Sequence, residues 1–199
     1  MLAKKRILVI SPQRWGKMYL IKHHYAVELA KRGNEVYFLN PPDVTLGKSM
    51  DVRKHGEIEN LHMVTYRPVF PISIRFRLRW LYDLLIGYQI KKIVAGIGTS
   101  FDIVWCFDLL LYTDLKKFGG ALTIFHIGDV LYFDYQVKIA KSADIIFAVA
   151  EDILKFLTTV DKPKHFINHG ISGYFEKYAA ERLQAIGQGK ERSSADKVK

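Results

Sequence analysis

The stretch Lys5–Asn40, KRILVISPQRWGKMYLIKHHYAVELAKRGNEVYFLN, decides the fold class. Its first seven residues form a continuous β-prone run, which predicts a strand covered on both faces. Residues 19–32 then place apolar side chains at helical spacing, and Gly33 is a typical stop after a helix. A second β-prone run, Glu35–Asn40, follows and is closed by two prolines. The stretch therefore predicts a strand–helix–strand unit.

The same alternation continues along the chain. Apolar runs predict five further strands, and helical patterns predict helices at about residues 75–97, 109–117, 130–141, 151–159 and 174–186. We expect residues 43–60 to be irregular. The predicted strands are LHMVTY (61–66), DIVWCF (102–107), ALTIFHI (121–127), DIIFAV (144–149) and KHFIN (164–168). This order predicts an α/β fold, a Rossmann-like three-layer sandwich with a mainly parallel sheet of about six or seven strands.

Bulk composition narrows the class of protein. The 199 residues carry a net charge of +10, which favours an anionic partner such as a phosphorylated substrate, nucleic acid or an anionic membrane. Cys106 is the single cysteine, so no internal disulfide can form, and its apolar setting favours a buried, inert thiol. No apolar run reaches the roughly 20 residues that span a bilayer. We expect a cytoplasmic protein whose contact with a membrane, if it has one, is peripheral.

The loop after the first strand carries candidate substrate-binding residues. It lacks the G-x-G-x-x-G and G-x-x-x-x-G-K-[ST] patterns, which counts against a nicotinamide dehydrogenase and a P-loop NTPase. Arg14, Trp15, Gly16 and Lys17 precede a helix, whose N-terminal N–H groups favour anions, and the indole offers a stacking face. The alternative is a solvated loop with the indole packed on the neighbouring helix.

Two histidines and an aspartate are the other polar candidates near strand ends. His24 lies on the first helix and can face the cleft, but its neighbour points about 100° away, so we expect no metal site and no metal cofactor. His126 and Asp129 follow the run 121–127, where a parallel sheet exposes functional groups. The histidine suits general-base or phosphate-binding work and the aspartate can orient a hydroxyl. The alternative is a partly buried histidine and a helix-capping aspartate.

A basic, aromatic segment precedes the long central helix. Arg75, Arg77 and Arg79 cluster where their charges oppose the helix dipole, so local helix stability does not explain them. Together with Trp80 they are typical of contact with an anionic membrane surface. The alternative is that the arginines pair with acids elsewhere in the fold, or that the segment is extended. No zinc-finger spacing, RNP-like strand or compact basic helix favours nucleic acid.

Four segments, in order, resemble the N-terminal domain of GT-B glycosyltransferases, most closely the family-4-like group that builds bacterial polysaccharides of the teichuronic-acid type. They are RILVISPQRW, HHYAVELAKRGNEVYFLNPP, KSADIIFAVAEDILKFL and FINHGISGYF. The last resembles the segment that closes the family's first domain, with Asn168, His169 and Gly170 at the cleft border. Ala150 replaces the family's usual serine, and Ser172 its aspartate.

The resemblance implies an acceptor-side domain over residues 1–178, half of a GT-B fold, followed by a helix end and flexible tail over 179–199. It implies transfer of a sugar from a nucleotide-sugar, the donor substrate, to a saccharide or lipid-linked acceptor without a metal. The donor-binding half, with the family's E-x7-E pattern, is expected in a missing domain or partner chain, so this chain alone is expected to be inactive.

Two other function classes fit the same sequence. One is a non-catalytic binding or membrane-recruiting subunit of a split transferase. The other is a flavodoxin-like regulatory domain, although a receiver-type regulator would have an acidic pair after the first strand, where this chain has Ser11-Pro12-Gln13. The donor sugar, the acceptor, the anomeric outcome and the oligomeric state are left open by the sequence.

Overall fold

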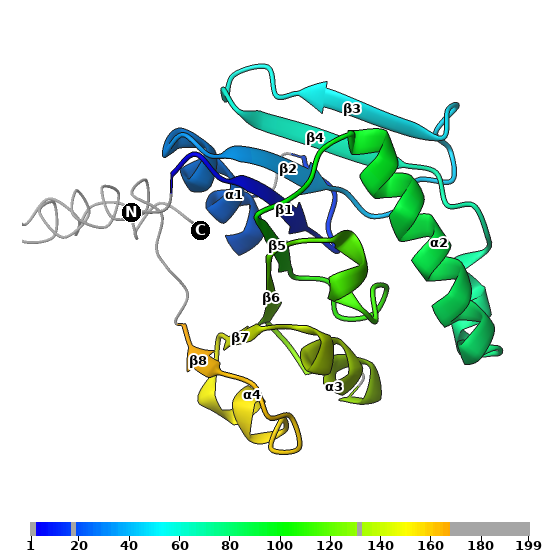
Figure 1. The fold of residues 1–199 in the computed structure, drawn as a ribbon, viewed down its shortest axis with the longest axis vertical. Coiled ribbons are helices and arrows are strands. Elements are labelled where there is room, and N and C mark those ends of the chain that lie inside the picture. Colours follow the sequence, from blue (N-terminus) through cyan, green and yellow to red (C-terminus); the bar gives the residue numbers. More distant parts are fainter. Residues whose placement is uncertain (1–2, 17–18, 131–132, 168–199) are drawn as a thin grey trace, which may run out of the picture. The chain divides into compact units, whose positions relative to one another are not determined.

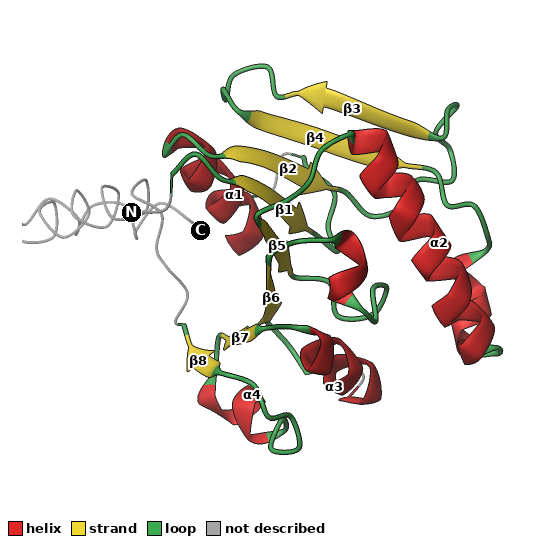
Figure 2. Ribbon diagram, viewed as in Figure 1, coloured by secondary structure: helices red, strands yellow, loops and turns green. Residues whose placement is uncertain are grey.

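The computed structural model describes residues 3–16, 19–130 and 133–167. Figure 1 shows a twisted central sheet with helices packed on it, and Figure 2 separates its strands from its helices. The described chain contains eight strands, in the spatial order β3-β4-β2-β1-β5-β6-β7-β8. They are β1 (Arg6–Ile10), β2 (Glu35–Leu39), β3 (Met50–Lys54), β4 (Leu61–Tyr66), β5 (Ile103–Cys106), β6 (Leu122–Ile127), β7 (Ile145–Ala148) and β8 (Lys164–Phe166).

All neighbouring strands are parallel except β3, which pairs antiparallel with β4. The predicted α/β Rossmann-like class is confirmed. Because β2 and β5 lie on opposite sides of β1, the strand order reverses between β1 and β5. Such a reversal leaves a crevice at the carboxyl ends of the two strands, where ligands of open α/β sheets bind.

Helices cover both faces of the sheet. α1 (Ile21–Lys31) packs against one face, where its Ala26, Leu29 and Ala30 join side chains of β1, β2 and β5. The longer α2 (Arg79–Ile97) packs on the other face. That face also holds the 3-10 helices η1 (Ile72–Phe76) and η2 (Leu115–Phe118) and the helices α3 (Phe133–Ser142) and α4 (Glu151–Lys155).

The continuous apolar run of β1 forms a strand that is almost entirely buried. Ile7, Leu8, Val9 and Ile10 of β1 are all fully buried, as expected for a parallel strand covered on both faces. Cys106 at the end of β5 is also fully buried, and burial raises the pKa of its thiol well above the usual value. The predicted burial of this cysteine is confirmed.

Three predicted elements differ in the structure. The irregular segment 43–60 contains β3, an exposed edge strand held by its pairing with β4. The helix predicted at 109–117 is wrong: only η2 forms there, because the Asp108 carboxylate accepts the backbone N–H groups of Leu110 and Leu111 and holds a turn instead. The helix predicted at 174–186 lies outside the described residues.

Candidate functional site

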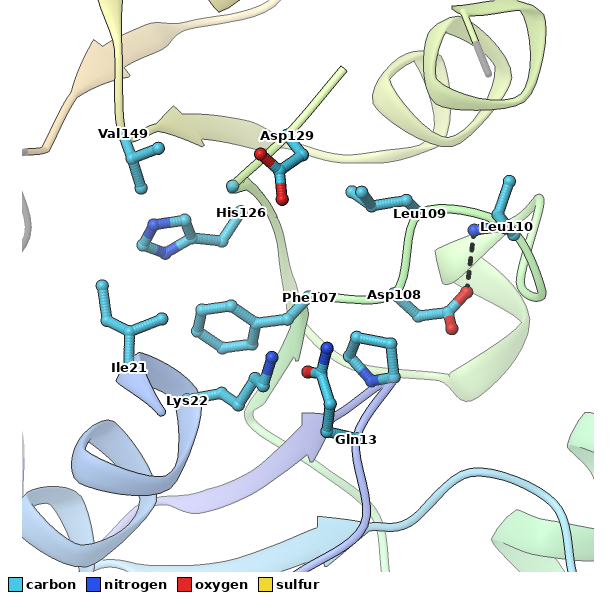
Figure 3. Close-up of a pocket in the computed structure, with 12 residues that line it drawn as sticks. Gln13, Ile21, Lys22, Phe107, Asp108, Leu109, Leu110, His126, Asp129 and Val149 are labelled. Atoms are coloured by element: carbon cyan, nitrogen blue, oxygen red, sulfur yellow. Dashed lines mark hydrogen bonds between the residues drawn. The ribbon is translucent and has the colours of Figure 1, made fainter. Parts of the chain in front are cut away.

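A pocket of about 180 Å³ opens at the carboxyl edge of the sheet, next to the point where the strand order reverses. Its walls come from the loops after β1, β5, β6 and β7 and from the first turn of α1, as Figure 3 shows. Segments far apart in the sequence therefore meet at one place. The lining residues are Pro12, Gln13, Ile21, Lys22, Phe107, Asp108, Leu109, Leu110, His126, Gly128, Asp129 and Val149.

His126 forms part of the aromatic wall of the pocket. It lies on β6 and is fully buried. Its ring stacks on Phe107 at 4.7 Å between centroids, and it also lies close to Trp105 and to Tyr25 of α1. The sequence prediction placed this residue at the correct edge of the sheet, but the ring is held between aromatic neighbours and reaches the pocket only along its border.

Asp129 stands at the mouth of the same pocket. It is exposed, and Figure 3 shows its carboxylate directed into the pocket space. Its backbone carbonyl accepts a hydrogen bond from the side-chain amide of the buried Gln136 in α3, which fixes the loop after β6. The carboxylate itself makes no hydrogen bond or ion pair within residues 3–16, 19–130 and 133–167, so it is available to a ligand hydroxyl.

Lys22 is the residue that sequence reasoning missed. It is the second residue of α1, is 7% exposed and lines the pocket. Burial lowers its pKa from 10.5 to about 8, although the charges of Asp129 and Asp108 partly oppose that shift. Its ammonium makes no hydrogen bond or ion pair with the described part of the chain. A buried, unpaired amine that faces a pocket is a candidate donor to a bound ligand.

A signal for Lys22 was present in the helical pattern. Ala26, Leu29 and Ala30 are buried core residues of α1, and Lys22, itself buried, stands four residues before Ala26 on the same helical face. A lysine at the start of a core-facing stripe cannot extend into bulk solvent as surface lysines do. The adjacent histidine pattern drew attention to His24 instead.

Asp108 shapes the pocket rather than offering its carboxylate to a ligand. The side chain is 4% exposed, and Oδ1 accepts the N–H groups of Leu110, at 2.9 Å, and Leu111. Burial raises its pKa, while those two hydrogen bonds and the charge of Arg75 act in the opposite direction. The residue thus holds the turn after β5 that forms one wall.

The loop after β1 lines the pocket with Pro12 and Gln13, which were not predicted, and not with the predicted Arg14, Trp15 or Gly16. Gln13 lines the pocket, and its backbone is held by Ser11, whose hydroxyl donates to the Gln13 carbonyl at 2.6 Å. Arg14 turns away and pairs with Asp43 at 2.8 Å. Gly16 is exposed and does not line the pocket.

Trp15 packs on the protein. Its backbone N–H donates to Asn40 at 2.7 Å, and its ring meets those of Phe38, at 4.8 Å, and His23, at 5.2 Å. The indole is therefore packed against the protein, which is the alternative considered for it from the sequence. The aromatic rings that line the pocket are those of Phe107 and His126. His24 lies half-buried beside Tyr19, 5.8 Å between centroids, and is not among the pocket's lining residues.

Four predicted site residues lie outside the described residues: Lys17, Asn168, His169 and Gly170. Within the ranges that the structure does describe, no group of three or more His, Cys, Asp or Glu side chains is placed to hold a metal ion. In those same ranges, no helix combines the length and the apolar character needed to cross a bilayer.

The basic segment lies on η1 and the start of α2, and none of its residues lines the pocket. The Arg75 guanidinium lies 4.6 Å from the ring centroid of Phe76, and that of Arg79 lies 4.1 Å from the ring of Tyr135 in α3. Arg77 is exposed, and 72% of Trp80 is accessible to solvent. None of the three arginines forms an ion pair with a described acid, although the charge of Arg75 acts on Asp108 and that of Arg79 acts on Asp83.

Solved structures with the same architecture identify the fold. A structure described as trehalose-6-phosphate from E. coli bound with UDP-2-fluoro glucose matches with a TM-score of 0.57 and 14% identity, over 91% of this chain and 54% of that one. The apo structure of OtsA matches with a TM-score of 0.59 and 13% identity, over 89% and 51%. A sucrose-phosphate synthase structure from Thermosynechococcus elongatus matches with a TM-score of 0.52 and 16% identity, over 92% and 98%.

These neighbours are GT-B glycosyltransferases, and the chain has the Rossmann-like α/β fold of one half of that architecture. The chain spans about half the length of the first and second of these structures. No protein-family model matches the sequence, and no curated protein matches it.

Proposed function

We propose that this chain is the acceptor-side half of a glycosyltransferase that moves a sugar from a nucleotide-sugar to a saccharide or lipid-linked acceptor. The observation that carries the proposal is the pocket at the strand-order reversal of a GT-B-type fold. There, Lys22 supplies a buried donor, Asp129 an acceptor and Gln13 an amide beside the rings of Phe107 and His126. Aromatic faces edged with such groups suit a hydroxyl-rich ring, which has an apolar face and polar edges.

The donor enters this proposal through the neighbouring structures. One of them is described as bound with UDP-2-fluoro glucose, and this chain covers 54% of it. The donor would then be bound mainly by residues beyond this sequence, in a further domain or a partner chain. The resemblance to the family-4-like group extends the proposal to polysaccharide biosynthesis of the bacterial cell envelope, on the cytoplasmic side of the membrane.

The proposed roles follow from exposure and position. In transfer, the acceptor oxygen bonds to the anomeric carbon while the bond from that carbon to the nucleoside diphosphate breaks, and the hydroxyl proton leaves for a base. Asp129 is suited to hold the acceptor hydroxyl, since its carboxylate is open to the pocket mouth. Lys22 is suited to anchor another acceptor oxygen, and His126 to form the wall against which the ring lies.

Binding and transfer give separate tests. Saturation-transfer NMR with saccharide acceptors should show binding to this chain, weakened by Lys22→Met and Asp129→Asn and unaffected by Lys31→Met, an exposed control on the same helix. In the enzyme with its donor-binding half, Asp129→Asn should lower kcat by about 10²–10⁴-fold if the carboxylate takes the proton. Unchanged turnover in Asp129→Asn would reject its role. Robust turnover by this chain alone would reject the half-enzyme proposal.

His126 needs a variant that preserves packing. His126→Phe keeps an aromatic ring against Phe107 and Trp105 and removes both nitrogens. A loss of turnover with unchanged stability supports a polar role on the acceptor, whereas full activity leaves the residue as wall only.

A second candidate function is a non-catalytic subunit that recruits a catalytic partner to a membrane. The exposed side chains of Arg77 and Trp80 favour it. In that case Lys22→Met and Asp129→Asn would leave the activity of the reconstituted complex unchanged, and only variants of the exposed surface would lower it.

A further inference from the structure

A set of large apolar side chains stands exposed along η1 and the first half of α2. We call this the α2 surface. Three of its members stand four residues apart on α2, so they lie along one face of the helix. The members and their exposed fractions are Phe76 67%, Leu78 46%, Trp80 72%, Leu84 69% and Tyr88 52%.

This exposure is confined to one face of a helix that is otherwise well packed. On its inner face α2 buries Tyr82, Ile86, Ile90 and Ile93 against the sheet, so the helix is apolar on both sides. Single exposed apolar residues are normal on protein surfaces, but a contiguous group of them rimmed by polar residues marks an interaction site. The outer face is therefore a candidate interaction surface, and the charges around it bear on the chemistry of its partner.

The charges around the α2 surface are positive and unpaired. Arg77, Lys91 and Lys92 are exposed and form no ion pair within the described residues, and the Lys92 ammonium lies 5.2 Å from the ring centroid of Tyr88. The single acid of α2, Asp83, accepts hydrogen bonds from Lys138 and Thr113, and its charge is balanced by that of Lys138. The partner should thus be both apolar and anionic.

We propose that the α2 surface docks on the face of an anionic lipid bilayer. Trp and Tyr rings insert at the level of lipid headgroups, Leu and Phe enter the acyl boundary, and flanking Arg and Lys attract anionic headgroups. A second copy of the chain would bring the same cations together across a symmetric interface, which opposes its own association. Nucleic acid would use the charges but leave Leu78 and Leu84 in water.

The position of the surface adds a geometric reason. β4 ends at the carboxyl edge of the sheet, and η1 and the start of α2 follow there, the edge at which the pocket opens. The charge of Arg75 in η1 acts on the pocket residue Asp108, where it partly opposes the rise that burial causes in the pKa of that carboxyl. Docking would bring the pocket edge near the headgroups, although docking itself does not depend on the proposed transferase activity.

Vesicle co-sedimentation with a matched charge control tests the proposal. The protein should bind vesicles of phosphatidylcholine with about one third phosphatidylglycerol, and bind phosphatidylcholine alone weakly. Arg77→Gln with Lys92→Gln should weaken binding roughly 20- to 30-fold, since each basic residue near the surface adds roughly a fivefold factor in affinity. Lys4→Gln with Arg32→Gln removes two charges that lie exposed before β1 and β2, and should change binding little.

The apolar side chains need a separate readout. Trp80 is 72% exposed, whereas Trp105 is 9% exposed and Trp15 is packed, so a blue shift and quenching by brominated lipid should report on Trp80. At high salt, Trp80→Ser with Leu84→Ser should lower the affinity for vesicles more than Arg77→Gln with Lys92→Gln does. Circular dichroism checks that each variant is folded.

Three results would overturn the docking proposal. Equal weakening by the two charge pairs would mean that the net charge alone attracts the protein to vesicles. An unshifted Trp80 spectrum on bound vesicles would place the α2 surface away from the lipid. Sedimentation velocity showing a dimer that Trp80→Ser with Leu84→Ser dissociates, with no vesicle binding, would assign the surface to a second copy of the chain.

Discussion

Replacing Lys22 by methionine should stabilise the domain at neutral pH. Lys22 is 7% exposed, and burial lowers its pKa from 10.5 to about 8 even though two aspartates attract its charge. A shift of that size corresponds to about 3 kcal/mol of differential stabilisation between the neutral and the charged amine. Methionine keeps an apolar stem and removes the charge, so the free energy of unfolding at about pH 7 should rise by about 1–3 kcal/mol.

The pH dependence gives the sign of the effect. Because the folded-state pKa of Lys22, about 8, lies below the unfolded value of 10.5, the unfolded chain binds more protons between those two pH values. Stability therefore rises with pH in that window, and the penalty of the buried charge is fully present below about pH 8. The gain from Lys22→Met should be largest at neutral pH and vanish as the pH approaches 10.5.

Urea unfolding at several pH values measures this directly. Wild type and Lys22→Met are compared at about pH 7, 8.5 and 10, which cancels the titration of all other groups to first order. Lys31→Met, on the exposed side of the same helix, is the control and should stay within about 0.5 kcal/mol of wild type. Two results would refute the conclusion that the buried charge of Lys22 destabilises the domain. One is a stability difference for Lys22→Met that is independent of pH, and the other is a loss of stability at neutral pH.

Three further changes test the fold around the site. Gly120→Ala places a Cβ 2.6 Å from a Val104 methyl carbon and should lower the free energy of unfolding by about 1–3 kcal/mol; an unchanged urea midpoint would contradict this. Asn40→Ala leaves the Trp15 backbone N–H without its 2.7 Å acceptor, and should destabilise by about 1–3 kcal/mol and redshift indole fluorescence. Cys106, fully buried and with its pKa raised by burial, should react with a thiol reagent only as fast as the protein unfolds; rapid labelling of the native protein would show that β5 opens locally.

The sequence predicted the parts of the fold that depend on continuous apolar runs. β1 and β2 were visible because strands buried on both faces contain few polar residues. β3 was missed because MDVRK lies at the sheet edge, mostly exposed, and needs only its pairing with β4. A strand that is stabilised mainly by pairing with one neighbour needs no apolar pattern in its own sequence.

The site could be predicted where it depends on strand ends and not where it depends on side-chain direction. His126 and Asp129 were found because the end of β6 fixes their place. Trp15 was ambiguous because a loop indole can face either way, and only the rings of Phe38 and His23 decide it. Lys22 was missed because lysines are mostly exposed, and only its place on the buried stripe of α1 turns this one inward.

The pocket and the α2 surface meet through η1, and this constrains what the domain can do. Arg75 lies over Phe76 of the α2 surface, and its charge also acts on the pocket residue Asp108. The Tyr135 hydroxyl of α3 donates to the Arg75 carbonyl at 3.0 Å, which holds this segment against the helix that follows the β6 loop. An acceptor carried in a membrane could thus be presented to Lys22 and Asp129 without leaving the interface, whereas a soluble acceptor would gain nothing from the exposed rings. Turnover of lipid-linked and of free saccharide acceptors in the presence of vesicles, measured for wild type and for Arg77→Gln with Lys92→Gln, would distinguish these two kinds of acceptor. The double variant should turn over the lipid-linked acceptor more slowly than wild type does, and the free acceptor at the same rate.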